Sequence, residues 1–343
     1  METEETLARL TEAAKRRFGS EAVVSGLSRL TAGASSESWR FEVQGTGQPT
    51  PRQMILRRPP AEIGQSDIDS FARRLAPGRL HEAAILGILN EAGLAVPEVQ
   101  FELEPADGLG TGYAMNFLDG APLPHRILKD PDYEAARAAL PGQIVDFRHH
   151  LNAIDGNRFD FLPEDFASDQ TKLFEEMLDW LSLGHAGLEL GLSWLRDHLP
   201  DPVTGKLVHG DYRLSNYLIT PTGLNAVIDW ELTHRGDPLE DLGWLCVRSW
   251  RFSRPDLAAA GLTERRSLLD SWNKVSGSQT RLRDLIFWEV LGNIKWAVLC
   301  LLQGQRYLSG SDTGIELAVI GRRVEEPVYD LIRLIEGKDG DLS

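Results

Sequence analysis

The sequence predicts an α+β fold of two lobes, an N-terminal lobe rich in antiparallel strands and a C-terminal lobe that is mainly helical. Short alternating segments precede Asp119 and Gly120, and long segments with helical spacing follow them. The length of 343 residues is too large for one ordinary core. A single group of short strands interrupts the helical half. We therefore expect lobes over residues 1–119 and 120–343.

The elements of the N-terminal half follow from periodicity and turn residues. Apolar residues recur at helical spacing over residues 5–18, which predicts a helix. Small residues in the segment 31–38 predict a turn between two strands within residues 23–43. The polar stretch 61–79 has few apolar anchors and predicts a mobile loop. The other expected elements are a strand at 53–57, a helix at 80–92, and a strand pair at 97–104 and 111–118.

The C-terminal half is predicted to be helical around one small group of strands. Short strands are expected at 206–209, 217–220 and 224–229, with a turn at Pro221–Gly223 between the last two. The segments with helical spacing are 132–154, 170–199, 239–251, 263–275, 281–304 and 313–336.

Composition excludes several classes of partner. The net charge of −15 argues against a broad basic face for nucleic acid. Cys246 and Cys300 lie in apolar stretches and are expected to be buried free thiols. The longest apolar run, near residues 296–302, is shorter than the roughly 20 residues of a membrane span, and the first 20 residues lack an apolar leader core. We therefore expect a cytoplasmic protein with no membrane, nucleic-acid or obligate protein partner.

The segment 208–229 carries the strongest chemical signal. A short loop presents Asp211 and, five residues later, Asn216, and a strand pair then returns the chain at Asp229. Phosphoryl transfer from ATP needs a carboxylate near the attacking hydroxyl and oxygen ligands for Mg²⁺. Asp211 suits the first task, and Asn216 with Asp229 suits the second.

Three linked motifs in this region resemble the aminoglycoside phosphotransferase and choline kinase family, relatives of the protein kinases. His209, Asp211 and Asn216 match the pattern H-x-D-x-x-x-x-N; Ile228–Glu231 and Gly236–Leu242 match I-D-[WF]-E and G-D-P-x-x-D-L. The resemblance covers roughly residues 23–305. It implies a protein-kinase-like fold, with a nucleotide-binding N-terminal lobe and a catalytic, substrate-binding C-terminal lobe. It also implies ATP- and Mg²⁺-dependent phosphorylation of a hydroxyl group.

The resemblance also gives roles to neighbours of Asp211. Arg213 stands where protein kinases carry a lysine that faces the transferred phosphate, so we expect it to clamp phosphate; pairing with a nearby acid is the alternative. His209 is expected to be structural. For Asp237 and Asp241 the simpler interpretation is a turn or helix-cap carboxylate. Glu231 is ambiguous between bracing the loop and orienting a ligand.

The expected nucleotide site lies in the N-terminal lobe. The small residues Gly33, Ser35 and Ser36 resemble the loop that covers phosphates in this family, although a surface turn has the same composition. The P-loop pattern G-x-x-x-x-G-K-[ST] does not occur. Arg57 replaces the usual lysine of the third strand and is expected to pair with Glu82 and reach the α and β phosphates.

Adenine is expected to pair with backbone groups of the hinge strand, at Asn116, Phe117 and Leu118. Another departure from the family is Asn152, where many relatives have a histidine; we assign it no catalytic role.

The acceptor should be a small molecule bound by the helical lobe. Seven residues are candidates for its wall, although core packing explains most tryptophans: Trp244, Arg248, Trp250, Trp288, Asn293, Lys295 and Trp296.

The basic and amide residues among these favour a neutral or anionic acceptor. The stretch Trp296–Gly321 also resembles the kinase-like region that accompanies acyl-CoA dehydrogenases in some fusion proteins, which implies a hydroxyacyl-CoA or related metabolite as the acceptor. An aminoglycoside-type antibiotic kinase and a nucleotide-binding pseudokinase are the alternatives.

Overall fold

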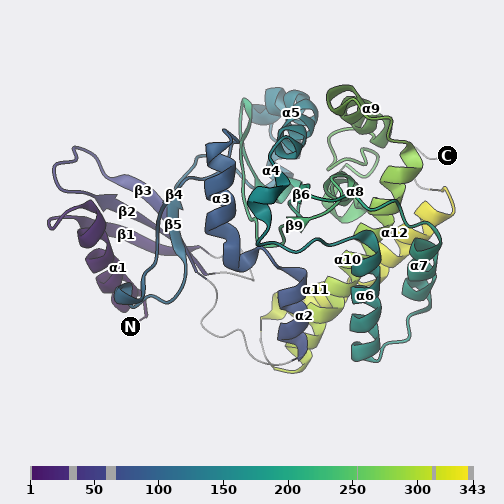
Figure 1. Ribbon diagram of the computed structural model, residues 1–343, viewed down its shortest axis with the longest axis horizontal. Helices are drawn as coiled ribbons and strands as arrows, with labels where there is room; N and C mark the ends of the chain where they lie inside the picture. The colour runs from purple at the N-terminus through teal and green to yellow at the C-terminus, as the bar shows by residue number, and fades with distance from the viewer. Residues whose placement is uncertain (1, 31–36, 59–66, 253, 311–313, 339–343) are drawn as a thin grey trace.

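The predicted α+β fold of two lobes is confirmed. The computed structural model describes residues 2–30, 37–58, 67–252, 254–310 and 314–338. A sheet with one covering helix lies at one end of the elongated molecule, and a large helical body lies at the other (Figure 1).

The N-terminal sheet has five antiparallel strands in the order β1-β2-β3-β5-β4. Alternate residues Trp39, Phe41 and Val43 of β2 point to one face, where they pack with Leu10 and Ala14 of α1. This small core is built by the N-terminal lobe alone. The bounds are α1 Glu2–Phe18, β1 Val23–Leu30, β2 Glu37–Gln44, β3 Arg52–Arg58, β4 Val99–Glu102 and β5 Tyr113–Asn116.

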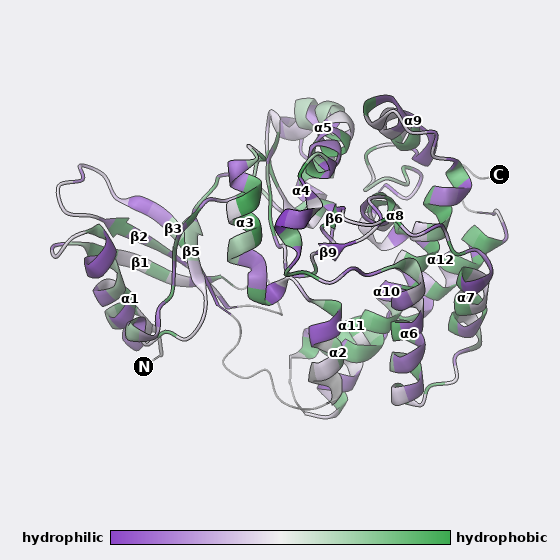
Figure 2. Ribbon diagram, viewed as in Figure 1, coloured by the Kyte–Doolittle hydropathy of each residue, from purple (hydrophilic) through white to green (hydrophobic). Residues whose placement is uncertain are grey.

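Helix α3, Glu82–Glu91, lies between the sheet and the helical body. Its buried residues Ile85, Leu86 and Leu89 join one core with C-terminal residues such as Val145. Figure 2 shows hydrophobic residues along α3, as expected for a helix covered on both sides. The largest core therefore crosses the boundary proposed from sequence at residue 119.

Helix α2, Asp67–Leu75, corrects the prediction of a mobile loop over residues 61–79. It docks on the C-terminal lobe: the ring of Phe71 lies 5.5 Å from that of Trp180, and Arg74 forms an ion pair of 2.6 Å with Glu176. These partners lie about 100 residues away in sequence, so local polarity does not reveal them. Residues 61–66 of that stretch lie outside the described part of the chain.

The C-terminal lobe is helical, as predicted, with two segments divided. The expected helix over 170–199 ends at Ser182, which has a left-handed φ of 52°, and a second helix follows. The segment 313–336 likewise forms two helices, and α4 was not predicted. The bounds are α4 Pro124–Lys129, α5 Glu134–Asn152, α6 Ala167–Leu181, α7 Ala186–Asp197, α8 Leu239–Cys246, α9 Arg265–Ser276, α10 Leu282–Leu308, α11 Ile315–Gly321 and α12 Glu325–Ile335.

Four short strands carry the loops of the candidate site. β7, Tyr217–Thr220, pairs with β8, Gly223–Val227, as predicted. β6, Leu207–Val208, pairs with β9, His234–Arg235, which the sequence did not reveal because it has only two residues.

Helix α10 corrects the prediction that no apolar run approaches a membrane span. It is long and apolar enough to cross a membrane, with an 18-residue window of mean hydropathy 1.7. In the structure 78% of that window is buried inside the protein, and helices α6, α7, α8 and α12 contact it. A core helix passes the same test of length and composition.

Candidate active site

The loop before Asp211 is held by Asp241. Its carboxylate accepts the N–H groups of His209 and Gly210, both at 3.0 Å, and lies 3.1 Å from Nε of Arg148. All these groups are buried. The prediction of a turn or cap carboxylate is therefore wrong for Asp241. For Asp237 it is confirmed, because Oδ1 accepts the N–H of Leu239 at 2.9 Å.

His209 is structural, as predicted. Its side chain is fully buried, donates Nε2–H to the carbonyl of Ile228 at 3.0 Å, and accepts the N–H of Asp211 on Nδ1 at 3.1 Å. Burial lowers the pKa of His209. The neutral ring therefore links the loop of Asp211 to the strand end that carries Asp229.

The Asp211 carboxylate is fixed by three side-chain donors. Oδ1 accepts from Nε of Arg213 at 2.7 Å and from Nε1 of Trp244 at 2.8 Å, and Oδ2 accepts from Nδ2 of Asn216 at 2.7 Å. Burial raises the pKa of Asp211, but the Arg213 cation and the hydrogen bonds outweigh it, and the net pKa is lowered. A carboxylate has about four lone-pair positions, so one remains for another donor.

Arg213 takes the alternative position considered from sequence, paired with an acid, and that acid is Asp211 itself. Its guanidinium carbon lies 4.4 Å from the ring centroid of Trp250, and its side chain keeps 27% exposure. Stacking on an aromatic face suits a planar cation. Its expected contact with phosphate stays a prediction.

Asn216 and Asp229 lie close together, because the N–H of Ile228 donates to the carbonyl of Asn216 at 2.9 Å. The left-handed φ of 69° at Asp229 bends the chain just after that bond. Asn216 uses Nδ2 on Asp211, which leaves its Oδ1 as the candidate metal ligand.

No group of three or more His, Cys, Asp or Glu residues suited to a metal occurs in the described part of the chain. Two oxygen-bearing side chains fit Mg²⁺, which keeps waters and takes phosphate oxygens.

The predicted ion pair between Arg57 and Glu82 is present. Nε of Arg57 lies 3.0 Å from Oε2 of Glu82, and Nη2 contacts Asp229 Oδ1. Burial raises the pKa of Glu82, with Arg57 opposing the shift. Arg58 points to the other face, as predicted, where Nε lies 2.8 Å from Oε2 of Glu37.

Glu231 braces the loop that follows Asp229. Its Oε2 lies 3.3 Å from Nη2 of Arg79 and 3.8 Å from Nη2 of Arg57. A Cβ on Gly78 would lie 2.6 Å from the carbonyl oxygen of Trp230, so only glycine permits this close approach. The bracing interpretation of Glu231 is the one that fits these contacts.

The three residues predicted to contact adenine, Asn116, Phe117 and Leu118, differ in whether their backbone N–H groups are already hydrogen-bonded. The N–H of Asn116 donates to Glu98 and the N–H of Phe117 donates to Gln53, each at 3.0 Å to the carbonyl oxygen. Both N–H groups therefore already have a partner. The backbone groups still expected to pair with adenine are the carbonyl oxygens of Asn116 and Phe117 and the backbone of Leu118. Gly33, Ser35 and Ser36 lie outside the described residues.

The predicted acceptor wall is wrong for three members. Asn293 and Lys295 are buried in α10, and Lys295 donates to the Gly210 carbonyl at 2.8 Å. Trp288 lines a separate pocket behind Asp237. Sequence reasoning could not place them, because α10 is apolar on most of its surface and shows no clear polar face.

Arg248 lines a different pocket from Trp288. This pocket has a volume of about 570 Å³ and lies between α4, the turn Arg248–Trp250 and α12. Trp250 of that turn stacks on Arg213 and lies 5.2 Å from the ring of Trp244 and 4.9 Å from that of Trp296. Core packing therefore explains these tryptophans, and the pocket adjoins Trp250 through its chain neighbours Arg248 and Ser249.

Comparisons with known proteins agree with this geometry. The profile of the phosphotransferase enzyme family matches residues 26–277. The mouse protein acyl-CoA dehydrogenase family member 10 is 28% identical over 212 residues, which cover 57% of this chain and 18% of that protein. The chain thus matches less than a fifth of that relative.

Solved structures share the fold. A putative aminoglycoside phosphotransferase from Ralstonia eutropha superposes with a TM-score of 0.69 at 19% identity, covering 96% of this chain and 98% of that one. An aminoglycoside phosphotransferase in ternary complex with AMP-PNP and hygromycin B has a TM-score of 0.58 at 18% identity, with 93% and 97% covered.

Proposed function

The chain belongs to the phosphotransferase enzyme family, and from this premise we propose that it transfers the γ-phosphoryl group of ATP to a hydroxyl group of a small molecule. The observation that carries the proposal is the Asp211 carboxylate, held ionised by three donors with one lone-pair position left over. That position suits the hydroxyl of an acceptor.

Asp211 would act mainly by orientation. Its lowered pKa makes it a weak base, so it would accept a hydrogen bond from the hydroxyl and take the proton as the new P–O bond forms. Phosphoryl transfer gains most from positioning and charge stabilisation, and a fixed carboxylate suits that need.

The cationic and oxygen-bearing groups would serve the nucleotide. Oδ1 of Asn216 and the carboxylate of Asp229 would hold Mg²⁺, which supplies charge neutralisation at the phosphates. Arg57 would exchange its contact with Asp229 for a contact with the α and β phosphates. The ion pair between Nε of Arg57 and Glu82 would remain in place. Arg213 would face the transferred phosphoryl group with the edge of its guanidinium that Asp211 does not use.

For the acceptor we propose a hydroxyacyl-CoA or a related metabolite. The mouse relative, named as an acyl-CoA dehydrogenase family member, supports this class. The pocket between α4, the turn Arg248–Trp250 and α12 is lined by Arg248 and Arg323, which suit the phosphates of such a molecule. Glu326 and Asp330 line the same pocket and would suit the amines of an aminoglycoside, which keeps that class as the second candidate.

The test is an ADP-coupled assay over three acceptor sets: hydroxyacyl-CoAs, amino sugars and choline-like alcohols. Asp211→Asn serves as the blank for each. Turnover with one set, absent in the blank, supports a kinase and names the acceptor class. Nucleotide binding without turnover above the blank in any set would instead support the pseudokinase.

We also propose that the protein acts in the cytoplasm and that the lobes divide at residues 119 and 120. Both cysteines, Cys246 and Cys300, are buried free thiols, which suits a reducing compartment. The boundary follows directly on β5 and the hinge residues Phe117 and Leu118.

A further inference from the structure

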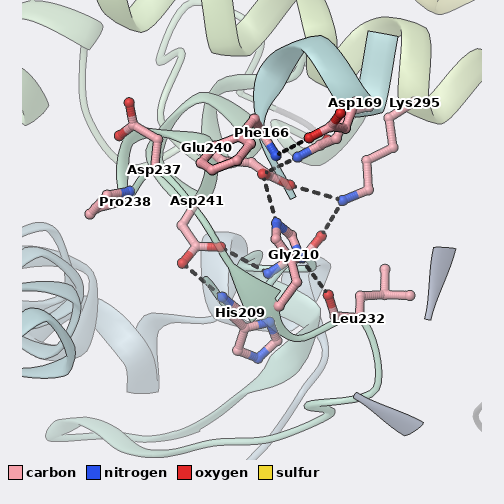
Figure 3. Close-up of polar contacts among 12 residues, drawn as sticks. Phe166, Asp169, His209, Gly210, Leu232, Asp237, Pro238, Glu240, Asp241 and Lys295 are labelled. Atoms are coloured by element: carbon pink, nitrogen blue, oxygen red, sulfur yellow. Dashed lines mark hydrogen bonds and ion pairs between the residues drawn. The ribbon is translucent and has the colours of Figure 1, made fainter. Parts of the chain in front are cut away.

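A closed ring of contacts surrounds the peptide that precedes Asp211. Lys295 Nζ donates to the Gly210 carbonyl at 2.8 Å and lies 3.3 Å from Oε1 of Glu240 (Figure 3). His234 joins Oε2 of Glu240 at 3.0 Å through Nε2 and the carbonyl of Leu232 at 2.9 Å through Nδ1. The ring closes because the Leu232 carbonyl lies directly over Gly210, where a Cβ would clash with it. We call these five residues the Lys295 ring.

The ring is charged and sealed from solvent. Lys295, Glu240 and His234 are only 5%, 3% and 3% exposed. Burial lowers the pKa of His234, but Glu240 outweighs it and raises that pKa to about 9. Burial raises the pKa of Glu240, but His234 and Lys295 bring it to about 2. Buried charges are costly unless paired, and each partner here compensates the next.

Two polar side chains outside the ring, Gln170 and Asp165, interact with its charged members. Gln170 donates Nε2 to Oε2 of Glu240 at 2.6 Å. Asp165 faces His234 and Glu240, and burial raises its pKa to about 6. Gln170 therefore supports Glu240 from α6, and Asp165 adds a carboxyl group beside His234.

Lys295 reaches Asp211 by two routes. The first is the backbone: the Gly210 carbonyl and the Asp211 N–H belong to one peptide plane, and Lys295 and His209 hold its two ends. The second is Trp244, whose ring lies 5.1 Å from Lys295 Nζ and whose Nε1 donates to the Asp211 carboxylate. A rotation of that peptide or a shift of that indole would move the carboxylate.

We propose that Lys295 is a positioning residue for phosphoryl transfer, which fixes the Gly210–Asp211 peptide and the Trp244 indole so that the Asp211 carboxylate meets the acceptor hydroxyl. This inference rests on the proposed function. Lys295 touches neither nucleotide nor acceptor, because it is buried beneath the loop. Misplacement of a reacting group by about 1 Å can cost on the order of 10²-fold in rate.

The first test is Lys295→Met, which keeps the length of the side chain and removes its charge and donors. We expect kcat to fall about 10- to 100-fold, while the KM for ATP stays within about threefold, because the ring contacts no nucleotide residue. The matched control is Lys206→Met: Lys206 also donates to a backbone carbonyl, that of Asn152 at 3.1 Å, but away from Asp211. Its kcat should stay within about twofold of the wild type.

A second variant and a spectroscopic signal keep the proposal testable. Glu240→Gln keeps the shape of the side chain but removes the charge that holds Lys295, and kcat should fall in the same direction. The indole N–H resonance of Trp244, assigned by its loss in Trp244→Phe, should shift in both ring variants and not in Lys206→Met. A wild-type kcat and an unshifted Trp244 resonance in either folded ring variant would overturn the proposal.

The same signal separates failure of this inference from failure of the proposed function. If the wild type transfers no phosphate to any acceptor, the proposed reaction fails, but the Trp244 resonance still reports whether Lys295 positions the indole. A shifted resonance then supports the structural half of the inference, and an unshifted one overturns it.

Discussion

Two groups of charged side chains flank the proposed catalytic residue Asp211, and they differ in the contacts that hold them in place. In the cleft, Arg57 joins Glu82 of the N-terminal lobe to Asp229 of the C-terminal lobe, and Glu82 also accepts the N–H of Trp230 at 3.1 Å. Beneath the loop, the Lys295 ring lies within the C-terminal lobe, and its charged members are at most 5% exposed. The first group is formed by contacts that cross between the two lobes, and the second by contacts within one lobe.

The difference separates a movable part of the site from a fixed part. The contact of Arg57 with Asp229 uses groups that the metal and phosphates would need, so nucleotide binding must exchange it. The donors to Asp211 need no such exchange, because Trp244, Arg213 and Asn216 hold the carboxylate already. Such preorganisation is what a reaction limited by positioning requires.

The largest effect is expected at the fixed part. Asp211→Asn should lower kcat by on the order of 10²–10⁴-fold, the usual contribution of a general base, since an amide cannot take the hydroxyl proton. Nucleotide affinity should change little, because Asp211 makes no contact with Arg57 or Asp229. Steady-state kinetics with a titration of a fluorescent nucleotide measure both values. Near-normal turnover would show that another group orients the acceptor.

The next effect is expected at the proposed metal ligands, Asp229 in the movable part and Asn216 in the fixed part. Asp229→Ala should weaken binding of the Mg²⁺-nucleotide by about tenfold or more, and Asn216→Ala should raise the Mg²⁺ concentration needed for half-maximal rate. Magnesium titrations at fixed ATP measure both. Curves for both variants that coincide with the wild type would place the metal elsewhere.

A smaller effect is expected at the movable part. Arg57→Ala should raise the KM for ATP about tenfold, in line with the loss of one charged hydrogen bond. The KM of Arg57→Lys should lie between those of the wild type and Arg57→Ala. Arg58→Ala is the matched control, because Arg58 faces Glu37 on the other side of the strand. Assays belong well below the melting temperature, since the change leaves Glu82 buried without its cation. If Arg58→Ala raised the KM for ATP strongly and Arg57→Ala did not, Arg58 and not Arg57 would be the residue that faces the nucleotide.

The sequence predicted the parts of this comparison that lie within short motifs. Asp211, Asn216 and Asp229 come together because β7 and β8 form a tight pair, which turn residues and spacing reveal. The partnership of Arg57 with Glu82 follows from strand alternation and the family pattern. These contacts are encoded locally or by a recognised motif.

The parts that were missed depend on distant packing. Lys295 was placed in the acceptor wall, yet its partner Glu240 is 55 residues away and the contact forms only when α10 packs on α8. Local polarity predicts a loop where α2 forms, because Trp180, which packs against Phe71, lies in the other lobe. Asp241 was taken for a cap because its partners precede it by about 30 residues. Periodicity alone contains no information on such contacts.

The smallest effect is expected at a third charged cluster, which lies outside the cleft. It serves as a reference for the movable and the fixed part of the site, because its loss should change stability and leave the kinetics unchanged. Asp107 ties α1 to the turn Pro105–Asp107: its carboxylate contacts Arg16 and accepts from Arg17 at 2.8 Å and from the N–H of Glu104 at 2.8 Å. Burial raises the pKa of Asp107, but the arginines and hydrogen bonds outweigh it and lower the pKa to about 2.

Because the folded pKa of Asp107 is below the ordinary value of 3.8, its ionised form stabilises the folded state. That contribution is fully present above about pH 5 and is lost as the pH falls toward 2. The whole shift would correspond to roughly 2 kcal/mol, but Arg16 is 42% exposed and solvent screens it, so we expect about 1 kcal/mol. Asp107→Asn should lower the free energy of unfolding by that amount at pH 7, measured by urea denaturation, with kcat and the KM for ATP unchanged. The difference from the wild type should shrink steadily between pH 5 and pH 3. A difference that stays constant over this range would mean that packing of the Asp107 side chain, and not its charge, holds α1 to the turn Pro105–Asp107.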